Sequence, residues 1–129
     1  MPTILIVDDD PGLLIAFETV LGLNGYQVRT AATAGAGLQT FEREQPDLVL
    51  LDYHLGAAQP DGLEVLRRFR RQRPEVPVML MSAYLYEATR EAALAAGASA
   101  CLEKPLTLHG LKQCVAQALR HANPVPHAA

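Results

Sequence analysis

The stretch Leu48-Val49-Leu50-Leu51-Asp52 decides the fold, because it is a short apolar run that ends in a carboxylate. Near-continuous hydrophobicity over so few residues is typical of a central strand in a parallel sheet, which is buried on both faces. Three further runs end in polar residues in the same way: Ile4-Leu5-Ile6-Val7 before Asp8 and Asp9, Val78-Met79-Leu80-Met81 before Ser82, and Ala100-Cys101-Leu102-Glu103 before Lys104.

Strand-like and helix-like runs alternate along the chain. The expected strands are 3–8, 26–31, 47–52, 77–82 and 99–103, and the expected helices are 11–23, 34–44, 61–73, 84–96 and 107–121. This alternation predicts an α/β fold, a doubly wound parallel sheet of five strands with helices on both faces. The run Tyr26-Gln27-Val28-Arg29-Thr30 alternates instead, which suits an edge strand.

Local signals mark the helix boundaries. Asp10 is the expected N-cap of the first helix, and Pro11 suits its first position because proline has no N–H to leave unpaired there. The other expected signals are N-caps at Thr33, Asp61 and Thr107 and stops at Asn24-Gly25 and Gly97.

The first helix carries more apolar residues than one face needs. One stripe at helical spacing should face the sheet, and it consists of Leu13, Ala16, Phe17, Val20 and Leu21. Leu14 and Ile15 fall outside that stripe, so we expect two adjacent apolar side chains to be exposed, as is typical of a docking patch.

Composition places the chain among single globular domains. It has 129 residues, of which 50% are hydrophobic and 19% charged, which suits one core. The net charge of −3 lacks the basic footprint of a nucleic-acid binder. No apolar stretch reaches the ~18 residues that span a bilayer, and the N-terminus does not resemble a signal peptide. We expect a cytoplasmic protein with neither nucleic-acid nor membrane binding, in which Cys101 and Cys114 are reduced packing residues.

The segment Arg67-Arg68-Phe69-Arg70-Arg71-Gln72-Arg73 is strongly basic. On a helix, Leu63, Leu66, Phe69 and the stem of Arg70 would face the sheet, while the other arginines would point to water. A solvated basic face is favoured over a nucleic-acid site, because no helix-turn-helix follows.

The polar strand ends predict a phosphoryl-transfer site, because the carboxyl ends of parallel strands meet at one edge of a sheet. Asp8, Asp9 and Asp52 would repel one another unless a cation lay among them, and Mg2+ fits because it takes carboxylate and phosphoryl oxygens. Asp52 is the expected nucleophile, since an aspartate can accept a phosphoryl group as an acyl phosphate. Lys104 and Ser82 would neutralise and hydrogen-bond the phosphoryl oxygens.

Several short segments match one known family. They are Val7-Asp8-Asp9, Leu50-Leu51-Asp52, Asp61-Gly62-Leu63-Glu64-Val65-Leu66, Met81-Ser82-Ala83, and Gly97-Ala98 followed by Lys104-Pro105. Together they resemble the receiver domain of two-component response regulators, over residues 3 to about 121. The resemblance implies a flavodoxin-like fold with strand order 2-1-3-4-5. We expect a receiver domain at 1–122 and a flexible tail or linker stub at 123–129.

The resemblance also implies roles for the acidic residues. Asp52 would be the phosphoacceptor, charged from a phosphohistidine on a sensor histidine kinase or a histidine phosphotransfer protein. The Mg2+ ligands would be Asp52, Asp9 directly, Asp8 largely through water, and the backbone carbonyl of His54. The chain would be a phospho-accepting signalling switch and not a separate enzyme, although it would catalyse its own phosphotransfer and dephosphorylation.

The same resemblance assigns the switch. Ser82 and Lys104 would hold the phosphoryl oxygens, and the Lys104-Pro105 peptide is expected to be cis. The family usually places an aromatic residue three positions before this lysine, where its rotation reports phosphorylation. Here that position is Cys101, so Tyr84 could take over the signalling role.

Two features near the nucleophile bear on the lifetime of the phosphoryl group. The side chains of His54 and Tyr84 should flank the path of the attacking water, which predicts slow self-dephosphorylation. The loop 56–60 also departs from the family pattern of a proline and a short turn, and it should lie over the site.

Partners follow from the resemblance as well. Leu14, Ile15 and Pro105 are expected to dock the kinase. Helix 84–96, strand 99–103 and helix 107–121 would form the surface that switches toward an output domain or a downstream protein. A phosphorylation-dependent homodimer is also compatible with this surface.

Two other functions share parts of the pattern. A phosphatase that forms an aspartyl phosphate also uses Asp and Mg2+, but it normally carries a second Asp two residues after the nucleophile, where this chain has His54. A flavin-binding module shares the fold, but it needs a phosphate-cradling loop after the first strand, and Asp9-Asp10-Pro11-Gly12 would repel phosphate.

Overall fold

The computed structural model describes residues 1–56 and 61–122, so the expected tail and most of the loop 56–60 lie outside the described residues. Within those residues the strands are β1 (Thr3–Val7), β2 (Gln27–Ala31), β3 (Leu48–Asp52), β4 (Val78–Ser82) and β5 (Ala100–Glu103). The helices are α1 (Pro11–Leu23), α2 (Ala34–Glu44), α3 (Gly62–Gln72), α4 (Glu87–Ala95) and α5 (Leu108–Ala122). Each strand is one residue shorter than predicted.

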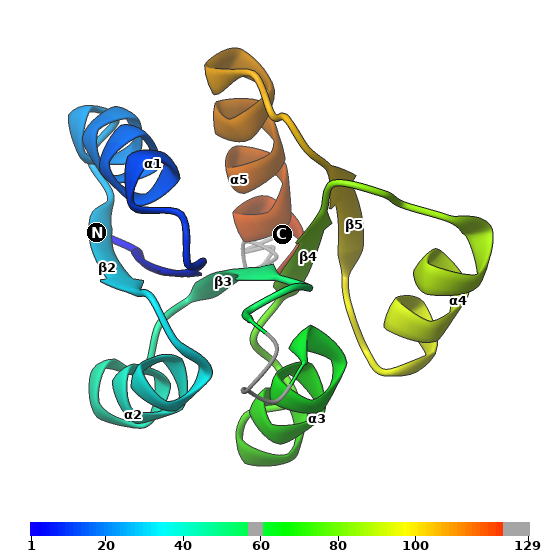
Figure 1. The fold of residues 1–129 in the computed structure, drawn as a ribbon. Helices are drawn as coiled ribbons and strands as arrows, with labels where there is room; N and C mark the ends of the chain where they lie inside the picture. The colour runs from blue at the N-terminus through cyan, green and yellow to red at the C-terminus, as the bar shows by residue number, and fades with distance from the viewer. Residues whose placement is uncertain (57–60, 123–129) are drawn as a thin grey trace, which may run out of the picture.

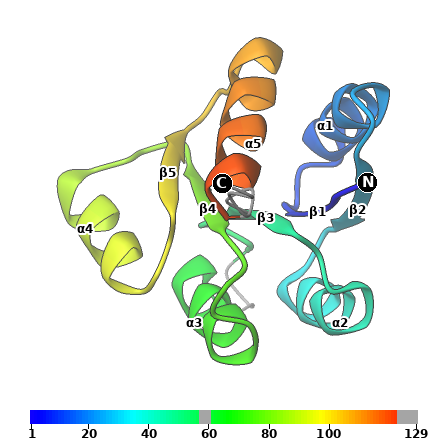
Figure 2. The same ribbon diagram turned by 180° about the vertical axis from the view of Figure 1, so that it is seen from behind.

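The strands form one parallel sheet in the order β2-β1-β3-β4-β5, as predicted. Helices α1 and α5 cover one face and α2 and α3 the other, while α4 lies beside the edge strand β5 (Figures 1 and 2). Strands β3 and β4 are buried along their whole length, whereas β2 is buried only at Val28 and Ala31. The hydrophobic pattern thus marked β3 and β4 as central strands and β2 as an edge strand, because only a central strand is covered on both faces.

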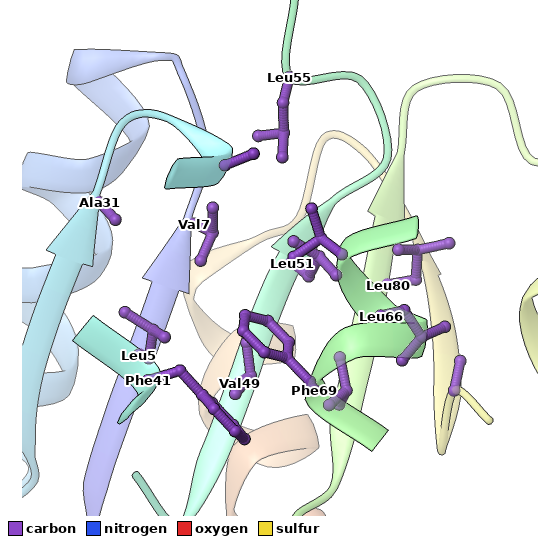
Figure 3. Close-up of a cluster of buried hydrophobic side chains, with 14 of the residues drawn as sticks. Leu5, Val7, Ala31, Phe41, Val49, Leu51, Leu55, Leu66, Phe69 and Leu80 are labelled. Atoms are coloured by element: carbon purple, nitrogen blue, oxygen red, sulfur yellow. The ribbon is translucent and has the colours of Figure 1, made fainter. Parts of the chain in front are cut away.

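A separate hydrophobic cluster fills each side of the sheet. Figure 3 shows the cluster between the sheet and helices α2 and α3, to which Phe41, Phe69 and Val49 belong. Their rings stack with centroids 4.2 Å apart, a contact that contributes about 0.5–1.5 kcal/mol beyond the area it buries. Helix α2 can approach β1 closely because Gly37 has no side chain. A Cβ at this position would lie only 3.0 Å from a methyl carbon of Val7.

The predicted caps hold α1, α2, α3 and α5 in place. The Asp10 carboxylate accepts the N–H groups of Gly12 and Leu13 at 2.9 and 3.3 Å. In α2, α3 and α5, the side-chain oxygen of the N-cap residue accepts the N–H of the residue three positions further on. These N-cap residues are Thr33, Asp61 and Thr107. Helix α4 is the exception, because it begins at Glu87 and not at 84, and the residue before it makes no side-chain capping bond.

Helix α1 is rolled about its axis relative to the prediction. Phe17 and Leu21 are buried as expected, but Ala16 is exposed and Leu14 is half-buried against the sheet. Leu14 lies three residues before Phe17 and seven before Leu21, so it shares their face of the helix. The prediction of two exposed residues is therefore wrong for Leu14, whereas Ile15 is 66% exposed.

The basic segment of α3 has a structural role at its C-terminal end. The Arg70 guanidinium is half-buried and donates to the carbonyl oxygens of Gly97 (2.6 Å), Pro74 (3.0 Å) and Val76. Arg73 was expected to point to water, but it also donates to a backbone carbonyl of the α2–β3 loop at 3.1 Å. These two residues donate to carbonyl oxygens in the loops before β3, β4 and β5. The prediction of a solvated face holds for Arg67, Arg68 and Arg71, which are exposed.

Candidate functional site

The candidate site lies at the carboxyl edge of the sheet, where four neighbouring strands end. Asp8 and Asp9 follow β1 directly, Asp52 and Ser82 are the last residues of β3 and β4, and Lys104 follows β5. Because the strands are parallel and adjacent, residues separated by up to 96 positions in the sequence come into contact. The structure therefore brings together the five side chains that the sequence singled out.

Three carboxylates form the acidic part of the site. Asp8, Asp9 and Asp52 each offer an oxygen within 4.8 Å of the others. Asp8 is fully buried and Asp52 is 4% exposed, whereas Asp9 faces solvent. Backbone N–H groups support the buried pair, since Asp10 donates to Asp8 at 2.9 Å and His54 donates to Asp52 at 3.4 Å. This oxygen-rich donor set fits a hard divalent cation.

Lys104 supplies the positive charge. Its Nζ lies 2.7 Å from Asp8 Oδ2 and 3.4 Å from Asp52 Oδ1. Burial alone would lower the pKa of Lys104, but the contacts with Asp8 and then Asp52 outweigh burial and raise it. Burial and then the charge of Asp8 raise the pKa of Asp52, although Lys104 opposes them. One cation therefore compensates the buried carboxylates only in part.

Ser82 connects the site to the loop that leads into α4. Its side chain is fully buried, and its hydroxyl donates to the carbonyl oxygen of Tyr84 at 3.1 Å and accepts the Tyr84 N–H at 3.3 Å. A serine hydroxyl has one proton to donate, so it cannot bond a phosphoryl oxygen while it keeps the bond to this carbonyl.

The remaining predicted residues surround this centre. The Lys104–Pro105 peptide is cis, as predicted. His54 is exposed and meets the ring of Tyr53 edge to face, with centroids 4.7 Å apart. Tyr84 is 67% exposed. Cys101 is half-buried, and it packs on the side of the sheet that α2 and α3 cover.

A hollow of about 350 Å³ opens beside the acidic cluster, between α1 and the β5–α5 loop. Its lining comprises Asp10, Gly12, Leu13, Ala16, Phe17, Lys104, Pro105, Leu106 and Leu108. Of the predicted docking residues only Pro105 lines it. Ala16, which was expected to face the sheet, is exposed and forms part of the wall of this hollow.

Two further residues near the site make contacts that were not predicted from the sequence. Glu103 accepts the N–H of Leu85 at 3.3 Å and so joins β5 to the β4–α4 loop. Gly62 lies so close to the end of β3 that a Cβ would be 2.7 Å from Tyr53 Cα. The glycine just after the N-cap Asp61 was the only sequence signal for the close approach of Gly62. No signal in the sequence indicated the bond to Glu103.

Comparison with known proteins agrees with this geometry. Residues 4–116 match the model of the response regulator receiver domain. The chain belongs to the receiver domain family. It is 37% identical over 116 residues to the nitrogen assimilation regulatory protein NtrX of Azorhizobium caulinodans, with 90% of this chain and 26% of that protein covered. It is 35% identical over 119 residues to the transcriptional regulatory protein PrrA of Mycobacterium tuberculosis, with 92% and 50% covered.

A solved receiver domain from Methanospirillum hungatei, described as CheY-like, has a similar structure, with a TM-score of 0.91, 32% identity, and coverage of 96% of this chain and 98% of that one. The chain spans between about a quarter and a half of the length of NtrX and PrrA. Receiver domains are switches in phosphorylation-based signalling and work with histidine kinases and output domains. No helix among the described residues is long and apolar enough to cross a membrane.

Proposed function

We propose that this receiver domain takes a phosphoryl group onto Asp52 from the phosphohistidine of a sensor histidine kinase or a histidine phosphotransfer protein, and that the transfer depends on Mg2+. The supporting observation is the buried pair of Asp8 and Asp52 with Lys104 bound to both carboxylates. This arrangement has more negative charge than one lysine compensates, and phosphoryl transfer relies mainly on positioning and charge neutralisation.

Asp8, Asp9, Asp52 and the backbone carbonyl of His54 are the proposed Mg2+ ligands. The three carboxylate oxygens within 4.8 Å of one another support this set, and Mg2+ would neutralise charge on the phosphoryl oxygens. In the transfer, an Asp52 carboxylate oxygen forms a bond to phosphorus while the bond from phosphorus to the histidine nitrogen breaks. The electron pair returns to the imidazole. Lys104 and the Ser82 hydroxyl then bind two phosphoryl oxygens and hold the acyl phosphate.

Acetyl phosphate tests this proposal without a kinase. With Mg2+, intact-mass analysis should detect one labile phosphoryl adduct on the wild-type chain and none on Asp52→Ala. Chelation of the metal should abolish the adduct. An adduct of the same yield on Asp52→Ala would overturn the assignment of the phosphoacceptor.

The kinase is proposed to dock over α1 and the hollow lined by Pro105. Ile15 remains a candidate anchor because it is 66% exposed on the helix beside the cleft, while Leu14 contributes mainly to packing. Ile15→Ser should slow transfer from the cognate kinase but not from acetyl phosphate, which needs only the cleft. Leu23→Ser is the matched control, since Leu23 is 83% exposed at the far end of the same helix. Equal slowing by both variants would contradict the docking role.

The output side is proposed to be α4, β5 and α5, acting in the cytoplasm on an output domain or a downstream protein, or on a second copy in a phosphorylation-dependent dimer. We assign the receiver domain to residues 1–122. Slow self-dephosphorylation is also proposed, because the exposed side chains of His54 and Tyr84 adjoin the site. His54→Ala and Tyr84→Ala should shorten the lifetime of the adduct, and an unchanged lifetime in both would contradict the gating of water by these side chains.

A further inference from the structure

A second hollow, of about 410 Å³, lies between β4, β5 and α5 at the amino ends of the strands. Its rim includes Pro77 before β4 and Ser99 before β5, and its wall includes Gln117 and Ala118 from the second half of α5. None of the described residues that line it belongs to the candidate site, which lies at the opposite edge of the sheet. Its volume is in the range of small-ligand sites, ~300–1,000 Å³. We call it the amino-edge hollow.

The lining of the amino-edge hollow fits an uncharged occupant. Arg70 and Glu75 are its charged members and carry opposite charges. An anionic ligand would therefore meet the Glu75 carboxylate, and a cationic ligand would meet the Arg70 guanidinium. Most of the remaining lining is apolar and is contributed by Pro74, Pro77, Met79, Leu102, Cys114 and Ala118.

The polar part of the lining offers hydrogen-bond donors. Arg70 donates through Nε to the Gly97 carbonyl and through Nη1 to the carbonyls of Pro74 and Val76. A guanidinium has five N–H groups, and these bonds use Nε and Nη1, so Nη2 can donate to a further acceptor. The side-chain amide of Gln117, an exposed residue, adds two N–H donors. An apolar occupant rich in carbonyl oxygens would match this lining.

The chain carries such a segment directly after α5. It is Asn123-Pro124-Val125-Pro126, which lies outside the described residues. The segment has no charged side chain, and its two prolines keep their carbonyl oxygens but have no N–H. Proline-rich segments favour the extended polyproline II conformation, whose carbonyls make no internal hydrogen bonds and which loses little conformational freedom on binding.

The end of α5 places this segment within reach of the amino-edge hollow. Helix α5 ends at Ala122, which is four residues, or about one turn and 6 Å, beyond Ala118 in the wall of the hollow. Asparagine tolerates the left-handed conformation that often ends helices, and proline cannot continue a helix. Asn123 and Pro124 therefore favour a change of direction. Three extended residues span up to about 10 Å, so Val125 can return to the level of Ala118.

We propose that Pro124-Val125-Pro126 docks in the amino-edge hollow of its own chain, with Val125 against the apolar lining and Arg70 Nη2 donating to a carbonyl oxygen of the segment. The docked segment covers the amino ends of β5 and α5. A partner that binds at this end of the output surface must displace it. That consequence rests on the proposed function, whereas the docking itself requires neither Mg2+ nor a phosphoryl group.

Cys114 reports whether the hollow is covered, because it is half-buried and lines the hollow. In a Cys101→Ser background it is the only thiol, and Cys101 packs on the other side of the sheet. The rate of its reaction with iodoacetamide should rise roughly ten-fold in Val125→Asp, the factor by which the burial of one valine side chain shifts an equilibrium at the low end of its range. The matched control, His127→Asp, adds the same charge two residues later and should react like the background protein.

Proton NMR of the unphosphorylated wild-type chain gives a direct second measurement. Nuclear Overhauser effects should connect the Val125 methyl groups to the Met79 methyl group, since Met79 lines the hollow. Their absence, or equal thiol reactivity in Val125→Asp and the background protein, would overturn the proposal. Protection of Cys114 that increases with protein concentration would also overturn it, because a second copy would then cover the hollow. Neither measurement involves Asp52, so failure of the proposed phosphorylation would leave both results unchanged.

Discussion

Replacement of Lys104 by methionine tests the electrostatics of the site directly. Lys104 Nζ lies 2.7 Å from Asp8 Oδ2, and at an effective dielectric constant of about 20 the attraction between such charges is about 6 kcal/mol. Desolvation offsets part of that attraction, because the Lys104 side chain is only 20% exposed. Removal of one partner from a buried pair costs about 3–5 kcal/mol. We expect Lys104→Met to lose about 3 kcal/mol of unfolding free energy in the absence of metal, near the lower end of that range.

Urea unfolding in the presence of a chelator measures this loss, with Lys112→Met as the control because Lys112 is an exposed lysine on α5. Millimolar Mg2+ should then stabilise Lys104→Met more than the wild type, since a bound cation replaces the missing charge. A loss below about 0.5 kcal/mol, the usual range for surface substitutions, would refute the reasoning. So would equal stabilisation of both proteins by Mg2+.

Three further predictions concern stability. Burial raises the pKa of Asp52, so the contribution of this carboxyl group to the stability of the folded protein is lost as the pH rises above the ordinary pKa of 3.8. In the absence of metal, Asp52→Asn should therefore have a higher melting temperature than the wild type at neutral pH, and its melting temperature should change less in thermal scans between about pH 3 and 8. Gly62→Ala should cost about 1–3 kcal/mol in urea unfolding, because its Cβ would lie 2.7 Å from Tyr53 Cα, and wild-type stability would show that the backbone relaxes. Arg70→Met should lose about 2 kcal/mol more than Arg68→Met in the same assay, because it leaves partly buried carbonyls unpaired, and equal losses would contradict the anchoring role.

The order of the elements and the members of the site could be predicted from the sequence. Apolar runs of about five residues and capping residues act locally, so they identify strands and helix starts without knowledge of the partners. Because the carboxyl ends of parallel strands lie at one edge of the sheet, four residues could be assigned to one site from the sequence: Asp8, Asp52, Ser82 and Lys104. The edge position of β2 followed from its alternating pattern.

Only the tertiary structure decided which surfaces those elements present. The roll of α1 buries part of Leu14 and exposes Ala16, because the helix adjusts to packing against β-strand side chains that its own sequence does not encode. Helix α4 begins only at Glu87, and the loop before it makes hydrogen bonds with Ser82 and Glu103, which lie outside the helix. The buried guanidinium of Arg70 depends on loop carbonyls up to 27 residues away. Local propensity depends on one segment alone, whereas these contacts form only when distant segments fold against each other. At these positions the tertiary hydrogen bonds and packing outweigh the local propensity.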